Sequence, residues 1–256
     1  FTIVYRRIDG NIRRLAWPAL FAVIVAFGTI PAVDYANGRS FALPAERVCL
    51  VKAGFVEKYS SIYLPFERWE ENAENDFNTF YIWGQRVGIL NRYYVNLDQA
   101  LRECKALFLI LPRRHFTKED REKADLFLRR GGKVFLFDDG DAGSTANEFL
   151  AGYGLALARR ADGNGEIVDP RTGDGWKNRF PVGVLSGTAK PLLIWRDGQA
   201  KEFPVLVTKR VGKGDLYIFG GMHSFSNRGF GYDGVVPTGE VQVINRWILT
   251  VYKFIH

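Results

Sequence analysis

The sequence ALFLILPRRHFTKEDREKADLFLRRGGKVFLF, residues 106–137, decides the fold. Its first part, 106–111, is an unbroken apolar run that ends at a proline, which predicts a buried β-strand. Thr117, followed by acidic residues, predicts the N-terminus of a helix, and Gly131-Gly132 predicts the end of that helix. The second apolar run, 134–137, predicts another buried strand. Two unbroken apolar strands joined by a helix indicate a βαβ unit in a parallel sheet that is covered on both faces.

Strand and helix patterns continue to alternate on both sides of this unit. Apolar runs predict strands at 48–51, 92–95, 192–195, 203–209 and 216–219, and apolar residues at helical spacing predict helices at 67–81, 97–104, 144–153 and 240–254. Residues 159–180 are polar and rich in glycine, so we expect a long surface excursion there. The chain is therefore predicted to be an α/β protein with a mostly parallel sheet flanked by helices, in a flavodoxin-like arrangement.

Composition places the chain among folded proteins and argues against one class of partner. Hydrophobic residues make up 47% and charged residues 25% of the 256 residues, which is close to the globular average and excludes a disordered or collagen-like chain. The net charge of +7 would suit a nucleic-acid partner, but the basic residues are dispersed and no nucleic-acid-binding motif accompanies them. We expect no nucleic-acid partner and attribute the excess charge to solvated surface and to the flank of a membrane segment.

Residues 15–33, LAWPALFAVIVAFGTIPAV, contain no charged residue. A helix of this length nearly spans a hydrocarbon core of about 30 Å. The residues that would anchor such a helix are Leu15, Trp17, Leu20, Phe21, Val25, Phe27 and Ile30. A signal peptide cut near Ala36 is a less favoured alternative, because the chain retains the segment. A buried core helix is also less favoured, because no polar stripe interrupts the apolar surface.

The charges beside this segment predict its orientation. Four arginines and one acidic residue precede it, whereas the charges that follow are balanced, so the positive-inside rule places the N-terminus in the cytoplasm. We expect a basic cytoplasmic segment (1–14), a transmembrane helix (15–33), a linker (34–45) and a periplasmic domain (46–256). The protein would then be a single-pass protein of the bacterial inner membrane, unless a helix upstream of Phe1 reverses this orientation.

The two cysteines each stand at the start of an apolar run. If the strands containing Cys49 and Cys104 are neighbours, an oxidising compartment would permit a disulfide between them. Two buried thiols are the alternative, because a sequence does not specify the distance between Cβ atoms. Neither cysteine belongs to a C-x-x-C motif, which argues against zinc binding and thioredoxin-like chemistry.

Three groups of residues carry a family resemblance. They are 106–112 with 116–120 and 131–137, the segment WGQRVG at 83–88, and GKGDLYIFG at 212–220 followed by Ser226-Asn227. Over about residues 46–255 the chain resembles class I glutamine-amidotransferase-like proteins, and in particular the catalytically empty branch found in membrane-anchored bacterial proteins. The resemblance implies an amidotransferase-like fold more firmly than an activity.

An active amidotransferase of this class needs a nucleophilic cysteine on a sharp turn after a strand, together with a histidine and a glutamate. The turn after 134–137 reads DDGD, residues 138–141, and offers no Cys, Ser or Thr. By the resemblance, His223 falls near the family's histidine, whereas Ser224 and Phe225 stand where its proline and glutamate would be. We expect no amidotransferase catalysis, and no cofactor, since no haem, iron–sulfur or dinucleotide motif is present.

Asp138, Asp139 and Asp141 are the main candidates for ligand binding, with His223 and Asn227 farther along the chain. The three acids follow a predicted strand, and ligands of open α/β sheets bind at the carboxyl ends of strands. Carboxylates suit Mg²⁺ or Ca²⁺, but no calcium-loop pattern is present. We therefore favour a role in capping the following helix and predict no metal site.

Three functional hypotheses follow from the sequence. The first is a non-catalytic accessory or scaffold subunit of a larger membrane complex, in transport, envelope, respiratory or photosynthetic assembly. Its partners would be integral membrane subunits, through protein–protein contacts, and the lipid bilayer. The second is a membrane-anchored module that binds a small ligand or glycan at 138–141. The third is an unconventional hydrolase that uses His223 and Asp139.

Overall fold

The computed structural model describes residues 51–60, 77–160, 164–229 and 239–255, all within one compact unit, Leu50–His256. The predicted basic segment, transmembrane helix and linker precede these residues and lie outside the description, as do all the anchor residues from Leu15 to Ile30. Within the described ranges, no helix has both the length and the apolar character needed to cross a membrane.

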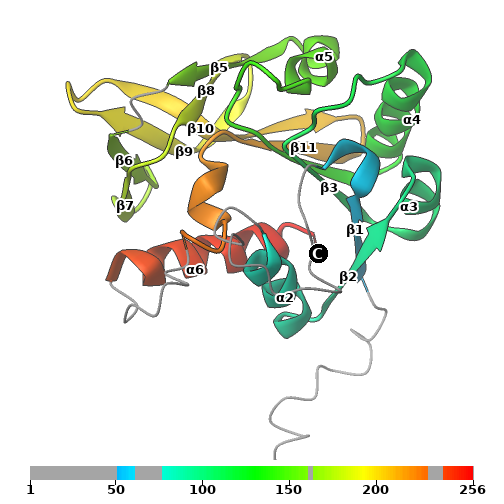
Figure 1. Ribbon diagram of the computed structural model, residues 1–256, viewed down its shortest axis with the longest axis horizontal. Helices are drawn as coiled ribbons and strands as arrows, with labels where there is room; N and C mark the ends of the chain where they lie inside the picture. The colour runs from blue at the N-terminus through cyan, green and yellow to red at the C-terminus, as the bar shows by residue number, and fades with distance from the viewer. Residues whose placement is uncertain (1–50, 61–76, 161–163, 230–238, 256) are drawn as a thin grey trace, which may run out of the picture. The chain divides into compact units, whose positions relative to one another are not determined.

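A nine-stranded sheet forms the centre of the described part of the chain (Figure 1). Its strands are β1 (Val51–Val56), β2 (Ile89–Tyr94), β3 (Ala106–Ile110), β4 (Lys133–Phe137), β6 (Gly165–Val168), β7 (Gly175–Asn178), β9 (Lys190–Asp197), β10 (Glu202–Val211) and β11 (Gly214–Phe219). The spatial order is β2-β1-β3-β4-β11-β10-β9-β6-β7. Neighbouring strands are parallel from β2 to β11 and antiparallel from β11 to β7. The predicted α/β class is confirmed, although the antiparallel extension makes the sheet mixed.

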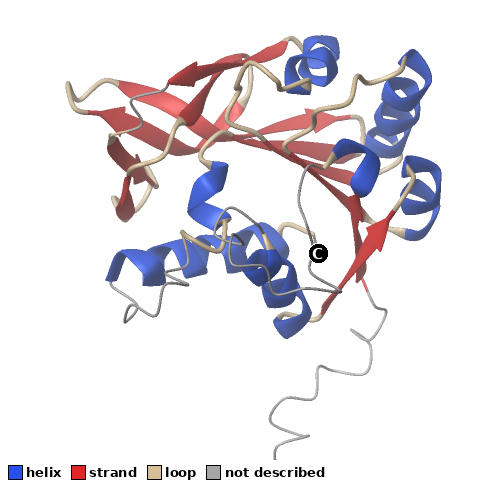
Figure 2. Cartoon of the chain, viewed as in Figure 1, coloured by secondary structure: helices blue, strands red, loops and turns tan. Residues whose placement is uncertain are grey.

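Helices cover both faces of this sheet (Figure 2). They are α2 (Asn78–Arg86), α3 (Leu97–Glu103), α4 (Lys118–Arg129), α5 (Ala146–Leu150) and α6 (Gly239–Lys253), with short 3₁₀ helices η2 (Glu57–Tyr59), η4 (Ala151–Tyr153) and η5 (Met222–Phe225). A separate antiparallel pair consists of β5 (Leu155–Arg160) and β8 (Val182–Gly187). The predicted helices at 97–104, 117–130, 144–153 and 240–254 are thus confirmed in place and type.

The apolar run of β3 is unbroken because both faces of the strand are buried. Phe108 packs in the cluster beneath α2 and α6, where its ring stacks on those of Phe55 and Phe135 at centroid distances of 4.7 and 4.8 Å. Leu107 and Leu109 belong to the opposite cluster, beneath α3, α4 and α5. A parallel strand between two helical layers has no solvated face, so no polar residue interrupts it.

Helix α4 begins as its sequence predicts. The hydroxyl Oγ1 of Thr117 accepts a hydrogen bond from the backbone N–H of Asp120 at 3.1 Å and donates one to the Asp120 carboxylate at 2.8 Å. The same carboxylate is 2.7 Å from Nζ of Lys58, so the N-cap also ties η2 to α4.

We expect Thr117→Ala to lower the free energy of unfolding by about 1–2 kcal/mol, because the N-cap bond and one partner of a buried carboxylate are lost together. Urea denaturation of the purified chain measures this difference. Thr117→Ser keeps both hydrogen bonds and is the matched control. An equal loss for both variants would show that the methyl group, rather than the hydroxyl, stabilises this turn.

Three secondary-structure predictions need correction. The predicted strand at 48–51 shares only its last residue with the described β1, which continues to Val56. Of the predicted helix at 67–81, residues 67–76 lie outside the description, and α2 runs on to Arg86. The predicted surface excursion at 159–180 is wrong, because β6, β7 and the end of β5 lie within it. β6 and β7 are four residues each, and their hydrogen bonds connect them to each other and to β9, which no local pattern reveals.

Candidate functional site

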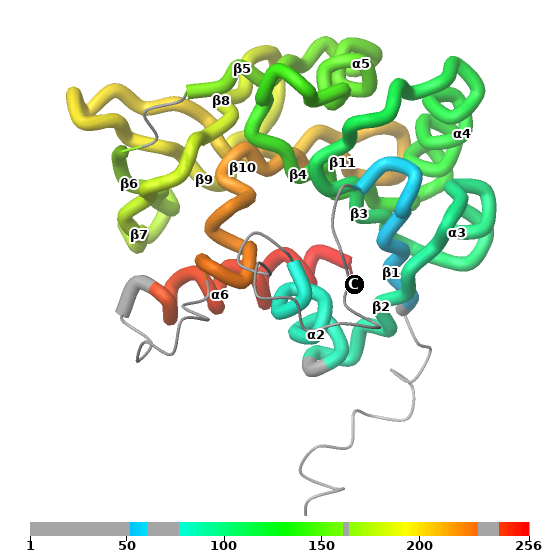
Figure 3. The backbone as a smooth tube through the Cα atoms, viewed as in Figure 1, coloured from blue at the N-terminus to red at the C-terminus, as the bar shows by residue number. Residues whose placement is uncertain are grey.

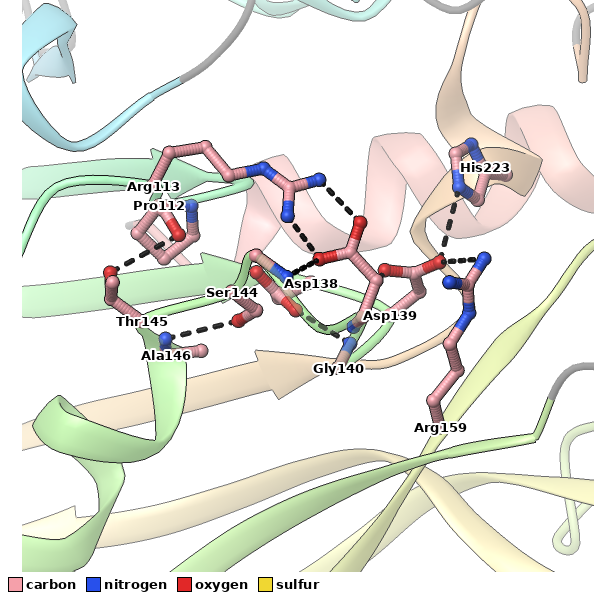
Figure 4. A network of polar contacts seen from close by, with 12 residues as sticks. Pro112, Arg113, Asp138, Asp139, Gly140, Ser144, Thr145, Ala146, Arg159 and His223 are labelled. Atoms are coloured by element: carbon pink, nitrogen blue, oxygen red, sulfur yellow. Dashed lines mark hydrogen bonds and ion pairs between the residues drawn. The ribbon is translucent and has the colours of Figure 1, made fainter.

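The carboxyl ends of β3, β4 and β11 bring the predicted site residues together (Figure 4). Arg113 follows β3, Asp138 and Asp139 directly follow β4, and His223 lies in η5, which follows β11. These strands are adjacent and parallel, so segments far apart in sequence meet at one edge of the sheet. The acids and His223 singled out in the sequence are therefore neighbours in the structure.

Asp139 is the centre of this group. Its Oδ2 atom lies 3.6 Å from Nε2 of His223 and 3.4 Å from Nη2 of Arg159 on β5. The carboxylate is only 2% exposed, and burial alone would raise the pKa of Asp139. The neighbouring His223 and Arg159 outweigh that effect and hold the pKa below its usual value, so Asp139 is an anion paired with cationic or hydrogen-bonding groups.

Asp141 forms a separate two-pronged ion pair with Arg113. Both terminal guanidinium nitrogens of Arg113 contact the Asp141 carboxylate, one of them at 2.6 Å. The carboxylate also accepts the backbone N–H of Gly143 at 3.0 Å. Arg113 lowers the pKa of Asp141, so the Asp141 carboxylate stays ionised. Its negative charge and the positive charge of Arg113 cancel.

Asp138 has a different environment from its two neighbours. It is fully buried, its Oδ1 accepts the backbone N–H of Gly140 at 2.6 Å, and burial raises its pKa to about 6. No hydrogen-bond partner reaches its Oδ2 within the described ranges, and the same holds for the buried Nδ1 of His223. Two adjacent acids at one strand end thus differ in charge near pH 6, because one is paired and the other is enclosed.

The group does not form a metal centre in the part of the chain that the structure describes, where no three His, Cys, Asp or Glu side chains are arranged to hold a metal ion. Each acid instead accepts a backbone N–H two residues ahead of it, at Gly140, Asp141 and Gly143. These are Asx-type turns that shape the loop leading to α5. The predicted capping role is wrong, because none of these bonds reaches α5, whose N-cap residue Thr145 makes no side-chain cap hydrogen bond.

Strand β8, which pairs with β5 (Figure 3), passes close to the carboxyl ends of β4 and β11 at Gly183. The backbone N–H of Gly183 donates to the carbonyl of Gly220, at the end of β11, at 2.9 Å. A Cβ atom at Gly183 would lie 3.1 Å from the carbonyl oxygen of Asp138, so this backbone also passes close to the end of β4. The chain's own backbone thus occupies the carboxyl ends of both strands.

Asn227, another predicted site residue, has a structural partner. Asn227 is 2% exposed, and its Oδ1 accepts the backbone N–H of Thr79 at 2.9 Å, which joins the loop after η5 to α2. Cys104 is buried beside α3, whereas Cys49 lies outside the described residues, so the disulfide stays a prediction.

Sequence reasoning missed Arg113, Arg159 and Gly183 as parts of this edge. Arg113 stands one residue past the proline that ends a predicted strand. This position at a strand end could have identified it as a site residue. Arg159 lies in β5 and Gly183 in β8, and the sequence predicted neither strand. Their approach depends on the β5–β8 pair, which only the tertiary structure defines.

No model of a known protein family matches the chain, and no curated protein matches it. Among solved structures, the chain is similar to the mmIFT52 N-terminal domain, with a TM-score of 0.57 and 17% identity over 79% of this chain and 97% of that one. It is also similar to a polyextremophilic β-galactosidase from the Antarctic haloarchaeon Halorubrum lacusprofundi, with a TM-score of 0.50 and 15% identity over 78% of this chain and 30% of the enzyme.

A further similar structure is the exo-β-1,4-mannosidase Op5Man5 from Opitutaceae bacterium strain TAV5, with a TM-score of 0.49 and 12% identity over 80% of this chain and 36% of the enzyme. The chain therefore spans about a third of the length of these two glycosidases. At such identities the similarity concerns the fold alone. The resemblance to amidotransferase-like proteins stays a prediction.

Proposed function

We propose that this protein is a non-catalytic accessory subunit of a larger bacterial membrane complex and acts through protein–protein contacts. In this proposal residues 15–33 anchor the chain in the inner membrane and the α/β domain lies in the periplasm. The observation that carries the proposal is the closed edge of the parallel strands. There, the backbone of β8 crosses the strand ends, and Asp139 and Asp141 are paired within the chain.

An edge arranged in this way contributes to stability rather than to turnover. A general acid or base must reach the reacting atom of a substrate within hydrogen-bond distance. Asp138 and Asp139 are each at most 2% exposed, and Nδ1 of His223 is buried. The polar groups at this edge therefore support the domain, and its partners would bind elsewhere on its surface.

Mild-detergent extraction of the full chain from native membranes tests the proposal. Size separation followed by mass spectrometry should find the chain with the subunits of a larger complex in fixed proportion. A chain that migrates alone in several mild detergents, or that is recovered without detergent, would overturn the proposal.

Substitutions at the strand edge should leave this assembly intact. We expect Asp139→Asn and His223→Gln to co-migrate with the complex as the unaltered chain does, because the side chains of Asp139 and His223 are only 2% and 19% exposed. The melting temperature of each variant serves as the control for folding. Loss of co-migration by a variant that melts normally would place the binding surface at this edge.

A hydrolase is the second candidate, and the Asp139–His223 distance of 3.6 Å favours it. An Asp–His pair can orient an imidazole as a general base, and the nitrogen that would act as the base here is the buried Nδ1 of His223. Hydrolysis of p-nitrophenyl acetate and p-nitrophenyl glycosides by the unaltered chain and by His223→Gln tests this candidate. Turnover that disappears with His223→Gln would support a hydrolase, whereas equal background rates would support the accessory role. A melting-temperature screen with sugars would detect a glycan-binding edge, the other hypothesis from the sequence.

A further inference from the structure

The amino ends of the parallel strands lie at the edge of the sheet opposite to the acids, and basic residues gather there. The backbone N–H of Lys105, which precedes β3, donates to the carbonyl of Lys52 in β1 at 3.0 Å. The N–H of Lys133, the first residue of β4, donates to the carbonyl of Lys105 at 3.0 Å. The N–H of Lys213, in the turn before β11, donates to the carbonyl of Arg129 in the last turn of α4 at 3.2 Å. Backbone hydrogen bonds thus bring basic residues from separate segments to one edge.

Three helices end at the same edge. Helices α3 and α4 precede β3 and β4, so their last turns, with Arg102 and Arg129, lie beside the starts of those strands. Helix α6, with Lys253 in its last turn, ends there because Nζ of Lys133 donates to the carbonyl of Phe254. Together, the basic residues that all these segments place there form the basic edge, namely Lys52, Arg102, Lys105, Arg129, Arg130, Lys133, Arg210, Lys213 and Lys253.

The acids beside the basic edge are too few to neutralise it. Three acids pair with its members, Glu103 with Lys52, Asp125 with Arg129 and Asp215 with Arg210. Five exposed cations of the edge have no acidic partner within the described ranges, namely Arg102, Lys105, Arg130, Lys213 and Lys253. The edge therefore carries an excess of positive charge, whereas the acids at the carboxyl ends of the strands are paired or buried.

The positive charges at this edge are close enough to act on one another. Burial lowers the pKa of the Lys133 ammonium, and the nearby cations Arg210 and Lys105 lower it further, against an opposing effect of Asp215. The C-termini of helices stabilise cations, so the last turns of α3, α4 and α6 offset part of this repulsion within the fold. An external anionic surface would relieve the remainder.

The chain also enters the described domain at this edge. Val51 is the first residue of β1, and residues 34–50 connect it to the proposed anchor at 15–33. Seventeen residues span at most about 60 Å when fully extended, so a bilayer that holds the anchor stays within that distance of the amino end of β1. A tether of this length keeps the local concentration of lipid high, so each contact with a headgroup can be weak.

We propose that the basic edge binds the anionic headgroups of the bilayer in which the chain is anchored. The inference rests on the proposed function, because it needs the anchor. Ammonium and guanidinium groups donate charge-assisted hydrogen bonds to phosphate oxygens. Each Lys or Arg within about 10 Å of an anionic lipid surface strengthens the attraction about fivefold. The carboxyl ends of the parallel strands then face away from the bilayer, and the domain has a defined orientation toward the other subunits of the complex.

Acetylation of the full chain in lipid nanodiscs tests the inference. One set of nanodiscs contains phosphatidylcholine alone, and the other contains phosphatidylcholine and phosphatidylglycerol in equal parts. Brief treatment with acetic anhydride, followed by mass spectrometry, measures the reaction rate of each lysine. Lys105, Lys213 and Lys253 should react about fivefold more slowly in the anionic nanodiscs, and salt at about 0.5 M should remove the difference. Lys118, Lys177 and Lys201, which are exposed and lie outside the basic edge, should react equally in both.

A charge-reversal pair tests whether the basic edge is responsible. The double variant with Lys105→Glu and Lys213→Glu should bring the reaction rate of Lys253 in anionic nanodiscs back to its value in neutral ones. The double variant with Lys118→Glu and Lys201→Glu changes the net charge by the same amount and is the matched control, in which Lys253 should stay protected. Equal melting temperatures of the two double variants show that both fold.

Three results would overturn the inference, and they differ in what they say about the proposed function. Equal acetylation of a chain that enters both kinds of nanodisc would contradict lipid binding alone and leave the accessory role intact. A chain that enters neither kind would contradict the anchor, and with it both proposals. Protection of the same lysines by an added DNA duplex, without protection by phosphatidylglycerol, would identify a nucleic acid as the partner of this edge.

Discussion

Gly220→Ala is expected to lower the free energy of unfolding by about 3–5 kcal/mol, although it adds a single methyl group. A Cβ atom at position 220 would overlap the carbonyl oxygen of Gly183 and lie 2.6 Å from its carbonyl carbon. Neither backbone can move easily, because the N–H of Gly183 donates to Gly220 at 2.9 Å and the N–H of Gly220 donates to Val205 at 2.7 Å. The methyl group therefore separates β8 from the ends of β4 and β11.

Denaturant unfolding of the purified chain measures this effect. Gly152→Ala is the matched control, because the same methyl group there meets open space and should change stability by less than about 1 kcal/mol. If Gly220→Ala were as stable as that control, β8 would not be held against the strand ends. The description of the edge as closed, on which the proposed function rests, would then be wrong as well.

Asp138→Asn is expected to stabilise the protein at pH 7 and to have little effect at pH 4. The pKa of Asp138 is raised from 3.8 to about 6 in the folded chain, so between these values the folded state holds a proton that the unfolded state has lost. Stability from this group is present below pH 4 and declines as the pH rises to about 6. At about 1.4 kcal/mol for each pKa unit, the decline amounts to about 3 kcal/mol.

Unfolding free energies of the two chains at several pH values between 4 and 8 measure this difference. Asp139→Asn is the matched control with the opposite sign, because its folded pKa is lowered and its ionised form stabilises the fold above pH 4. The first variant should gain stability at neutral pH and the second should lose it. Equal losses at pH 7 would show that Asp138 is ionised and paired rather than enclosed.

The elements that the sequence predicted well are those with strong local signals. Strands β3 and β4, with α4 between them, follow from apolar runs, an N-cap and a glycine pair within 106–137. The final helix follows from one apolar face, whose Ile244, Trp247 and Val251 are all buried. In each case the residues that signal the element are also the residues that stabilise it. Residues close together in the sequence are therefore enough to predict the element.

Part of the candidate site was equally accessible to sequence analysis. Asp139 was singled out because acids that follow a parallel strand lie at the ligand-binding edge of the sheet, and His223 was singled out through the family resemblance. The structure brings the two side chains to 3.6 Å. The side chains around this pair could not be predicted from the sequence. Arg159 reaches Asp139 from β5, whose last two residues lay in the predicted excursion at 159–180. Oδ1 of Asn227 accepts a hydrogen bond from the backbone of Thr79 in α2.

By itself, the sequence determined the α/β class, the central βαβ unit and the absence of the cysteine nucleophile from the strand turn, because each depends on residue types within a short span. Only the tertiary structure decided that β6 and β7 extend the sheet, that β5 and β8 form a separate pair, and that Asp138 and Asp139 differ in charge. Hydrogen bonds between distant strands, burial and surface shape depend on which segments meet in space. Local sequence periodicity does not specify which distant segments contact each other.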